Sequence, residues 1–444
     1  MKNLRFIVQP GGKLTGRIRV PGDKSISHRS IMLGSLAEGV TEVTGFLEGE
    51  DALATLKAFQ AMGVEITGPT NGKVTIKGVG MKGLKQPVES LNMGNSGTSM
   101  RLLSGIVAGQ EFSCTLTGDA SLSKRPMKRV IDPLSLMGAK ISSQDKGLPP
   151  LTIQGSSQLK AIDYTLPMAS AQVKSCVLLA GLYAEGETRV VEPAPTRDHT
   201  ERMLRGFGYQ VESTKLDDLA TEIRLSGGGK LTATHIDVPS DISSAAFFMV
   251  AASIAPGSDL VIEHVGINPT RTGIIDILKL MGADILLENE REVGGEPVAD
   301  IHVRAAQLEG IVIPEHLVPL AIDEFPVLFV AASAAQGQTI LTGAEELRVK
   351  ESDRIQVMAD ALQAVGIDAQ PTEDGMIVNG GSQLAQSAAI ISHHDHRISM
   401  AMTVAGLRAV APITIDDCAN VNTSFPGFVK LAQSVGLMVA AEEA

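Results

Sequence analysis

Short segments rich in Lys, Arg, Ser and Gly recur along the chain at places where an apolar run begins. VPGDKSISHR puts Lys24, Ser25 and Arg29 at the start of a predicted helix, and GNSGTSMR puts Gly97 at the start of another. A helix N-terminus offers free N–H groups and the positive end of the helix dipole, so it binds anions readily. These segments therefore predict binding sites for small anionic ligands.

Further segments place charged or polar residues at the starts of later predicted helices. They are SKRPMKR, SAQVKS, PTRDHTE, NPTRTG, DEFPVLF, RVKESDR and HHDHR, and they supply Arg125, Ser170, Gln172, Lys174, Arg197, Arg271, Asp323, Glu324, Lys350, Glu351, Arg354, Asp395, His396 and Arg397. Each segment alone has an ordinary alternative, such as a helix cap or a solvated helix start with ion pairs. HHDHR also has residue types found in metal sites, but no second set of Cys or carboxylate ligands at metal spacing accompanies it, so we expect no metal.

The composition limits the kind of partner. The chain of 444 residues has a formal net charge of −12 at pH 7, which argues against nucleic-acid binding because that needs a basic face. Basic residues must therefore converge locally if they bind an anion. The apolar runs are too short to span a bilayer, the N-terminus lacks the apolar region of a signal peptide, and the three cysteines show no disulfide or zinc spacing. We expect a cytoplasmic protein that binds neither nucleic acid nor membrane.

The elements that must position these residues form a repeated pattern. An apolar predicted helix is followed by a β-like run, then by a second helical pattern that ends in Gly, and then by further β-like runs. The six glycines, separated by 75, 70, 74, 84 and 70 residues, are Gly63, Gly138, Gly208, Gly282, Gly366 and Gly436. Glycine just past a helix end is the usual left-handed cap. The spacing predicts six α/β repeats, although chance agreement between common α/β patterns is the alternative.

Two closely similar segments divide these repeats into halves. VPGDKSIS at the first repeat returns as VPSDISSA at the fourth, but only the first copy carries Lys24 and Arg29. We therefore expect two domains of three repeats each, one formed by residues 23–237 and the other by residues 1–22 plus 238–444. The second domain is discontinuous because the β-like run before Pro21 is expected to complete it.

Seven of the motifs taken together resemble the family of 5-enolpyruvylshikimate-3-phosphate synthases. They are VPGDKSISHR, GNSGTSMR, LSKRPMKRV, SAQVKS, PTRDHTE, RVKESDR and HHDHR, and they span almost the whole chain in the family's order. LSKRPMKRV and SAQVKSCVLLAGL resemble the class II bacterial branch. The resemblance implies an inside-out α/β barrel architecture of the enolpyruvyl transferase type, with two domains of three βαβαββ units, no cofactor and no metal. We expect a monomer.

The implied reaction transfers the enolpyruvyl group of phosphoenolpyruvate to the 5-hydroxyl of shikimate 3-phosphate and releases phosphate, in the pathway to chorismate and aromatic amino acids. By resemblance, the residues that bind shikimate 3-phosphate are Lys24, Ser25, Arg29, Ser170, Ala171, Gln172, Arg197, Asp323 and Lys350. Those that bind phosphoenolpyruvate are Lys24, Gly97, Arg125, Gln172, Arg354 and Arg397. Asp323, Glu351 and Lys24 are the catalytic candidates, because the reaction needs a base for the hydroxyl and a proton donor for carbon C3.

Two positions depart from the family pattern. Many members have Lys immediately before the C-terminal TFP phrase, whereas this chain has Thr423 before SFP, so one positive contact to the smaller substrate is missing. Enteric and plant members have Pro where this chain has Leu102. Glyphosate-tolerant class II members can have Ala at the position of Gly97. Because Gly97 is retained here, we expect glyphosate to bind.

Two alternatives stay open at this stage. UDP-N-acetylglucosamine enolpyruvyl transferase shares the fold and the donor, but most members have a reactive Cys five residues before the Arg-Pro, where this chain has Ala120. A non-catalytic ligand-binding member of the fold is the other alternative. It predicts loss of the acid–base residues, yet Lys24, Asp323 and Glu351 are all present.

Overall fold

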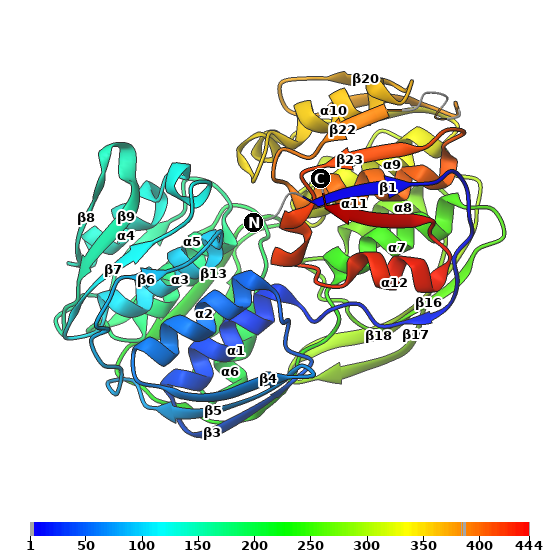
Figure 1. The fold of residues 1–444 in the computed structure, drawn as a ribbon. Coiled ribbons are helices and arrows are strands. Elements are labelled where there is room, and N and C mark those ends of the chain that lie inside the picture. The colour runs from blue at the N-terminus through cyan, green and yellow to red at the C-terminus, as the bar shows by residue number, and fades with distance from the viewer. Residues whose placement is uncertain (1–3, 383, 385–387, 444) are drawn as a thin grey trace. The chain divides into compact units, whose positions relative to one another are not determined.

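Two Val-Pro sequences mark the points at which the chain passes between two structural units. The computed structural model describes residues 4–382, 384 and 388–443 (Figure 1). One unit, called the first unit, comprises Gly22–Val238, and the second unit comprises Met1–Pro21 with Pro239–Ala444. No helix among the described residues is both long and apolar enough to cross a bilayer.

The first unit contains three repeats of one motif. The first repeat consists of α1 (Lys24–Leu36), β3 (Ala37–Thr44), α2 (Glu50–Ala61), β4 (Glu65–Thr70) and β5 (Lys73–Val79). The second consists of β6 (Leu91–Asn92), α3 (Gly97–Ala108), β7 (Ser113–Thr117), α4 (Lys128–Leu136), β8 (Lys140–Gln144) and β9 (Leu148–Gln154). The third consists of β10 (Asp163–Thr165), α5 (Ala171–Gly181), β11 (Glu187–Glu192), α6 (His199–Gly206), β12 (Glu212–Lys215) and β13 (Thr221–Ser226).

Each repeat of the first unit builds one sheet in the same order. In the second repeat the order is β6-β7-β9-β8, with β6 parallel to β7 and the other two pairs antiparallel. The first repeat lacks a leading strand of its own. Strands β14 (Leu231–Thr232) and β15 (His235–Asp237), from the end of this unit, pair in parallel with β3 and take that place. The end of the first unit therefore completes the sheet of its first repeat.

The second unit contains the other three repeats. The fourth consists of β2 (Thr15–Ile18), α7 (Ile242–Ile254), β16 (Asp259–Gly266), α8 (Gly273–Leu280), β17 (Asp284–Val293) and β18 (Glu296–Arg304). The fifth consists of α9 (Phe325–Ala334), β19 (Gly337–Leu341), α10 (Arg354–Ala364), β20 (Asp368–Pro371) and β21 (Met376–Gly380). The sixth consists of β22 (Ala388–Ile391), α11 (His396–Ala405), β23 (Ile413–Asp416), α12 (Phe428–Val435), β24 (Val439–Glu443) and β1 (Leu4–Val8).

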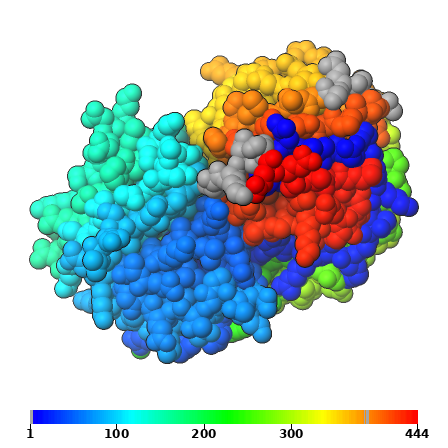
Figure 2. All heavy atoms as spheres, in the orientation of Figure 1, coloured from blue at the N-terminus to red at the C-terminus, as the bar shows by residue number. Residues whose placement is uncertain are grey.

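The N-terminal residues belong to this second unit by strand pairing. Strand β1 lies between β23 and β24, where Phe6 is opposite Ile415 on one side and Ala441 on the other. Strand β2 pairs in parallel with β16 and leads the fourth sheet. In Figure 2 the dark-blue N-terminal residues accordingly lie against the orange and red C-terminal residues. The N-terminus thus supplies the last strand of the sixth repeat and the first strand of the fourth.

The glycine spacing predicted the repeats correctly. All six glycines after the second helices have a left-handed backbone, with φ between 82° and 115°. Each ends a helix and turns the chain into the next strand. Together with the six sheets, this confirms the expected α/β architecture of six repeats with three in each unit.

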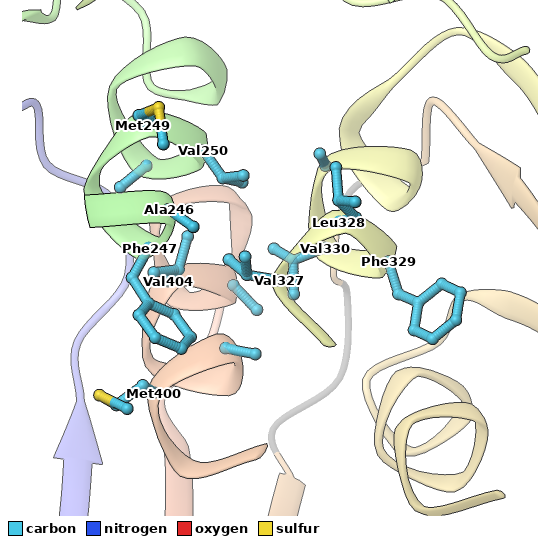
Figure 3. Packing of buried hydrophobic residues seen from close by; sticks show 14 of the residues in the cluster. Ala246, Phe247, Met249, Val250, Val327, Leu328, Phe329, Val330, Met400 and Val404 are labelled. Carbon is cyan, nitrogen blue, oxygen red and sulfur yellow. The ribbon is translucent and has the colours of Figure 1, made fainter. Parts of the chain in front are cut away.

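Buried helices form the centre of the second unit. All 13 residues of α7 and all 10 residues of α9 are buried, as expected for helices that are apolar on every side. Figure 3 shows apolar side chains such as Ala246, Val327 and Val404 lying between α7, α9 and α11. Because the sides of these helices are apolar and buried, only their termini have polar groups that a ligand could bind.

Close helix packing in the first unit generates a stability prediction. A Cβ atom on Gly105 of α3 would lie 2.3 Å from the carbonyl oxygen of Cys176 on α5, so Gly105→Ala must push two buried helices apart. We expect the free energy of unfolding to fall by about 1–3 kcal/mol, measured by urea denaturation. The matched control is Gly206→Ala, at an exposed helix end with no atom within 4 Å of the added methyl group. Equal stability of the Gly105→Ala and wild-type proteins would contradict this packing.

Candidate active site

The start of α1 holds a lysine next to a carboxylate. Asp23 caps the helix by accepting a hydrogen bond from the Ile26 amide at 2.9 Å. Lys24 Nζ donates to Asp51 Oδ2 on α2 at 2.8 Å, and about a quarter of the Lys24 side chain is exposed. The ion pair fixes the direction of the ammonium group, and the Lys24 side chain stays partly exposed.

Arg29 lies one turn deeper and connects three helices. Its guanidinium donates hydrogen bonds to Thr200 Oγ1 on α6 at 2.7 Å, to Ser175 Oγ on α5 at 3.0 Å and to the Ser25 carbonyl at 2.9 Å. Only 4% of the residue is exposed. Through these contacts Arg29 holds the starts of α1, α5 and α6 together.

A buried neutral histidine connects α1 to α3. His28 Nδ1 lies 2.8 Å from Thr55 Oγ1, and Thr55 Oγ1 lies 2.7 Å from Ser99 Oγ. Ser99 in turn donates its amide to Ser96, the cap of α3. Burial, followed by the nearby positive charges of Lys24 and Arg29, holds the pKa of His28 well below its usual value. The ring therefore adds no charge near pH 7.

Gly97 lies close to the side chains of two arginines. A Cβ atom at this position would be 3.0 Å from Arg101 Nη1 and 3.5 Å from Arg125 Nη1. Arg125 donates to Asn95 Oδ1 at 2.7 Å, and Gln172 accepts from Arg101 Nη1 at 2.5 Å. Gly97, Arg125 and Gln172, all predicted to bind phosphoenolpyruvate, thus lie in one region of the first unit.

The first turn of α5 has a polar N-terminus and contains a buried lysine. Ser170 caps the helix by accepting from the Val173 amide, so Ala171 and Gln172 form its first turn. Lys174 is fully buried and pairs with Glu192 at 3.0 Å and Glu201 at 2.8 Å. The sequence suggested Lys174 as part of an anion site, but the structure places its charge among protein carboxylates instead.

In the second unit, Arg354 is the centre of a charged cluster. It is 1% exposed and donates to Asp395 at 2.8 Å, to Glu351 at 2.6 Å and to Asp323 at 3.3 Å. Lys350 Nζ lies 3.7 Å from Asp323. Burial alone would lower the pKa of Arg354, but the three carboxylates outweigh it and raise that pKa. The cluster brings together four predicted site residues from the fifth repeat.

Glu324, the residue after Asp323, takes part in a different hydrogen-bond network. It is 3% exposed and accepts a short hydrogen bond from Ser243 Oγ at the start of α7. Arg271 donates to the same Ser243 oxygen at 2.6 Å and to Asp241 at 3.0 Å. Arg271, which the sequence suggested as an anion ligand, is therefore buried in a protein network, and this network anchors the backbone next to Asp323.

The charged side chains of the HHDHR segment have different surroundings. Asp395 caps α11 and pairs with Arg354, whereas Arg397 has no ion pair or side-chain hydrogen bond with any residue that the structure describes. Across residues 4–382, 384 and 388–443, no three His, Cys, Asp or Glu side chains are arranged to hold a metal ion. Thr423 donates to the Asn420 carbonyl and adds no charge.

Sequence reasoning missed several members of these clusters. Asp51 lies in the first turn of the second helix of the first repeat, near where other repeats carry arginine, so its place in the repeat was an available signal. Arg101 and Asp395 were recognised as polar residues at helix starts but were assigned to no substrate and no catalytic role. Glu192 had no sequence signal, because only the fold brings it to Lys174.

Comparison with known proteins decides the family. Residues 8–431 match the family model described as EPSP synthase (3-phosphoshikimate 1-carboxyvinyltransferase). The chain belongs to the EPSP synthase family. It is 77% identical over 441 residues, 99% of each chain, to the 3-phosphoshikimate 1-carboxyvinyltransferase of Hydrogenovibrio crunogenus, and 65% identical to that of Methylococcus capsulatus over 98% of each chain. The predicted family is confirmed.

Solved structures agree with this membership. The EPSP synthase from Acinetobacter baumannii matches with a TM-score of 0.89 and 62% identity, over 99% of this chain and all of that one. The enolpyruvyl transferase NikO from Streptomyces tendae matches over the full length of both chains with a TM-score of 0.79 but only 14% identity. The second likeness extends to the fold alone and confirms the enolpyruvyl transferase architecture.

The Arg354–Asp395 ion pair generates a prediction for this EPSP synthase family member. Asp395→Asn leaves the buried Arg354 without its most deeply buried carboxylate partner, so we expect the free energy of unfolding at pH 7 to fall by about 3–5 kcal/mol. Burial would raise the pKa of Asp395, but Arg354 outweighs it and lowers that pKa. The stabilisation is therefore complete above about pH 4 and is lost as the pH falls through the lower folded-state pKa.

Urea denaturation at pH 7 and at pH 3 measures this effect. The matched control is Asp353→Asn, which changes the cap of α10 in the same way but breaks only a partly exposed pair with Arg348, where a loss below about 1 kcal/mol is expected. Similar losses in the two variants would show that Asp395 acts only as a cap.

Proposed function

We propose that this chain transfers the enolpyruvyl group of phosphoenolpyruvate to the 5-hydroxyl of shikimate 3-phosphate and releases phosphate. The observation that carries the proposal is the grouping of Asp323, Lys350 and Glu351 around the buried Arg354 in a member of the EPSP synthase family. Two relatives at 77% and 65% identity are named 3-phosphoshikimate 1-carboxyvinyltransferase. Its action as a cytoplasmic monomer stays a prediction.

The proposed binding residues follow from the resemblance and are divided between the two units. In the first unit we assign Lys24, Ser25, Arg29, Ser170, Ala171, Gln172 and Arg197 to shikimate 3-phosphate, and Lys24, Gly97, Arg125 and Gln172 to phosphoenolpyruvate. In the second unit we assign Asp323 and Lys350 to the former substrate, and Arg354 and Arg397 to the latter. Helix starts and guanidinium groups suit phosphate and carboxylate groups, because they donate several hydrogen bonds to planar or tetrahedral anions.

The proposed chemistry has two steps in which protons move in opposite directions. As the 5-hydroxyl oxygen bonds to C2 of phosphoenolpyruvate, Asp323 takes the hydroxyl proton, and Glu351 with Lys24 supplies a proton to C3. The product of this step is a tetrahedral ketal phosphate. The bond between C2 and the phosphate oxygen then breaks, the C3 methyl group returns a proton, and the enol ether and phosphate leave. Carboxylates held by hydrogen bonds suit this work since both steps need a positioned acid or base.

The nucleotide-sugar alternative lacks support at its reactive cysteine. Ala120 stands at the position where most members of that family have Cys. The cysteines of this chain are Cys114, Cys176 and Cys418, and burial raises the pKa of each thiol to about 12. Thiols with so high a pKa stay protonated near neutral pH and are poor nucleophiles.

Phosphate release tests the proposal directly. The purified protein is mixed with phosphoenolpyruvate and with either shikimate 3-phosphate or UDP-N-acetylglucosamine as acceptor. We expect phosphate only with shikimate 3-phosphate. Release only with the nucleotide sugar would overturn the assigned acceptor, and no release with either acceptor would indicate a non-catalytic binding protein.

Lys24→Ala tests the assigned proton transfer. Removing a positioned charge that acts in the transition state typically slows an enzyme by about 10²–10³, so we expect kcat/KM to fall at least that much. Lys128→Ala is the matched control, because Lys128 lies on the same unit but forms only an exposed pair with Asp132. A fall of less than tenfold for Lys24→Ala, measured by phosphate release, would remove Lys24 from the catalytic set.

Gly97→Ala tests how closely the smaller ligand approaches α3. The added Cβ atom would enter the space next to Arg101 and Arg125, where a ligand bound by Arg125 must fit. We expect glyphosate to compete with phosphoenolpyruvate in the wild type, and its inhibition constant to rise at least tenfold in Gly97→Ala. Gly206→Ala, which adds the same methyl group at an open helix end, should leave inhibition unchanged. Failure of glyphosate to compete at millimolar concentration contradicts the prediction.

A further inference from the structure

Lys174 is the most deeply buried lysine of the first unit, and the proposed mechanism does not use its charge. Its side chain has no exposed surface, and its two carboxylate partners, Glu192 and Glu201, are also almost fully buried. Burial alone would lower the pKa of Lys174, but Glu201 and Glu192 outweigh it and raise that pKa. The ammonium group therefore stays charged, so an ionic cluster is retained inside this unit.

Each member of this cluster lies on a different segment. Lys174 is in the first turn of α5, two residues after Gln172. Glu192 is the last residue of β11, and Glu201 lies in the first turn of α6. The ion pairs thus join the ends of three elements at the place where the proposed shikimate 3-phosphate residues are found.

A threonine extends the cluster to the connection between β11 and α6. Thr196 Oγ1 donates to Glu192 Oε2 at 2.5 Å, and the same carboxylate oxygen pairs with Lys174. Thr196 immediately precedes Arg197, which is assigned to shikimate 3-phosphate. The hydroxyl therefore connects the backbone that carries Arg197 to the helix that carries Ser170 and Gln172.

A buried ion cluster contributes little net stability compared with apolar residues of similar size, because removing charges from water is costly. What it adds is a defined geometry, because each charged group can interact with its partners in only a few relative positions. Two segments that must bind the same phosphorylated ligand need such a fixed relation, because small errors in position weaken several hydrogen bonds at once.

We propose that Lys174, Glu192 and Glu201, acting through Thr196, form a positioning cluster for the shikimate 3-phosphate residues of the first unit. This inference rests on the proposed function. It predicts an effect on one substrate only. Arg125 is held separately by Asn95 and Ser121, and Gln172 is also held by Arg101 and Thr98, so these phosphoenolpyruvate residues have contacts that do not involve Thr196.

Thr196→Val tests the cluster with little change in side-chain volume. Loss of a hydrogen bond to a charged group should raise KM for shikimate 3-phosphate about fivefold to twentyfold, while KM for phosphoenolpyruvate changes less than about twofold. Thr196→Ser keeps a hydroxyl and should restore the wild-type value. Thr196→Ala, which removes the hydroxyl without adding a methyl group, is the second variant and should give the same split.

Thr188→Val is the matched control. Thr188 lies on the same strand as Glu192 and is fully buried, and its hydroxyl has no hydrogen-bond partner among the described residues. This variant should leave both KM values unchanged. Calorimetric titration of each protein with shikimate 3-phosphate alone should give the same order of affinities as the KM values.

The outcomes separate the two proposals. A wild-type protein that neither binds nor uses shikimate 3-phosphate overturns the proposed function before any variant is compared. An active wild type overturns the positioning role alone if Thr196→Val and Thr196→Ala keep the wild-type KM for shikimate 3-phosphate. Equal increases in both KM values also overturn it, because they indicate a general structural defect.

Discussion

The constraint on which this structure depends is that its central helices are buried on every side and still have unpaired N–H groups at their starts. A buried helix end must satisfy these groups with side chains or ligands. Five of the six central helices do so with a side-chain cap, namely Asp23, Ser96, Ser170, Asp241 and Asp395. Polar residues are therefore concentrated at one end of each helix, and a binding site for anions can develop there without disturbing the apolar core.

The first and fourth repeats show how the same helix start can serve two purposes. In the first repeat a cation on the leading helix, Lys24, pairs with Asp51 at the start of the following helix. In the fourth repeat Ile242 stands in the place of Lys24, and Asp241, the cap of the leading helix, pairs with Arg271 before the following one. Lys24 remains partly exposed, whereas Arg271 is buried. The sequence difference between VPGDKSIS and VPSDISSA thus separates a partly open charged site from a closed structural one.

Periodic features of this kind were predictable from the sequence, and contacts across repeats were not. The six glycines mark backbone positions that almost any other residue would strain, so their spacing identified the repeats before the structure did. Charge at a helix start carries no such information about exposure. Lys24 and Lys174 occupy similar motifs, yet only the fold brings Glu192 and Glu201 to Lys174 and buries all three side chains.

Arg354 and Arg397 illustrate why the direction of each hydrogen bond matters more than the count of positive charges. A guanidinium has five N–H groups, and Arg354 directs four hydrogen bonds at Asp323, Glu351 and Asp395. These hydrogen bonds orient Asp323 and Glu351, the two carboxylates proposed to transfer protons. Arg397, at the start of α11, has no ion pair or side-chain hydrogen bond with the described residues. Under the proposed function, the guanidinium group of Arg397 can therefore donate to a phosphate or carboxylate of phosphoenolpyruvate, while Arg354 holds the proposed acid–base pair in place.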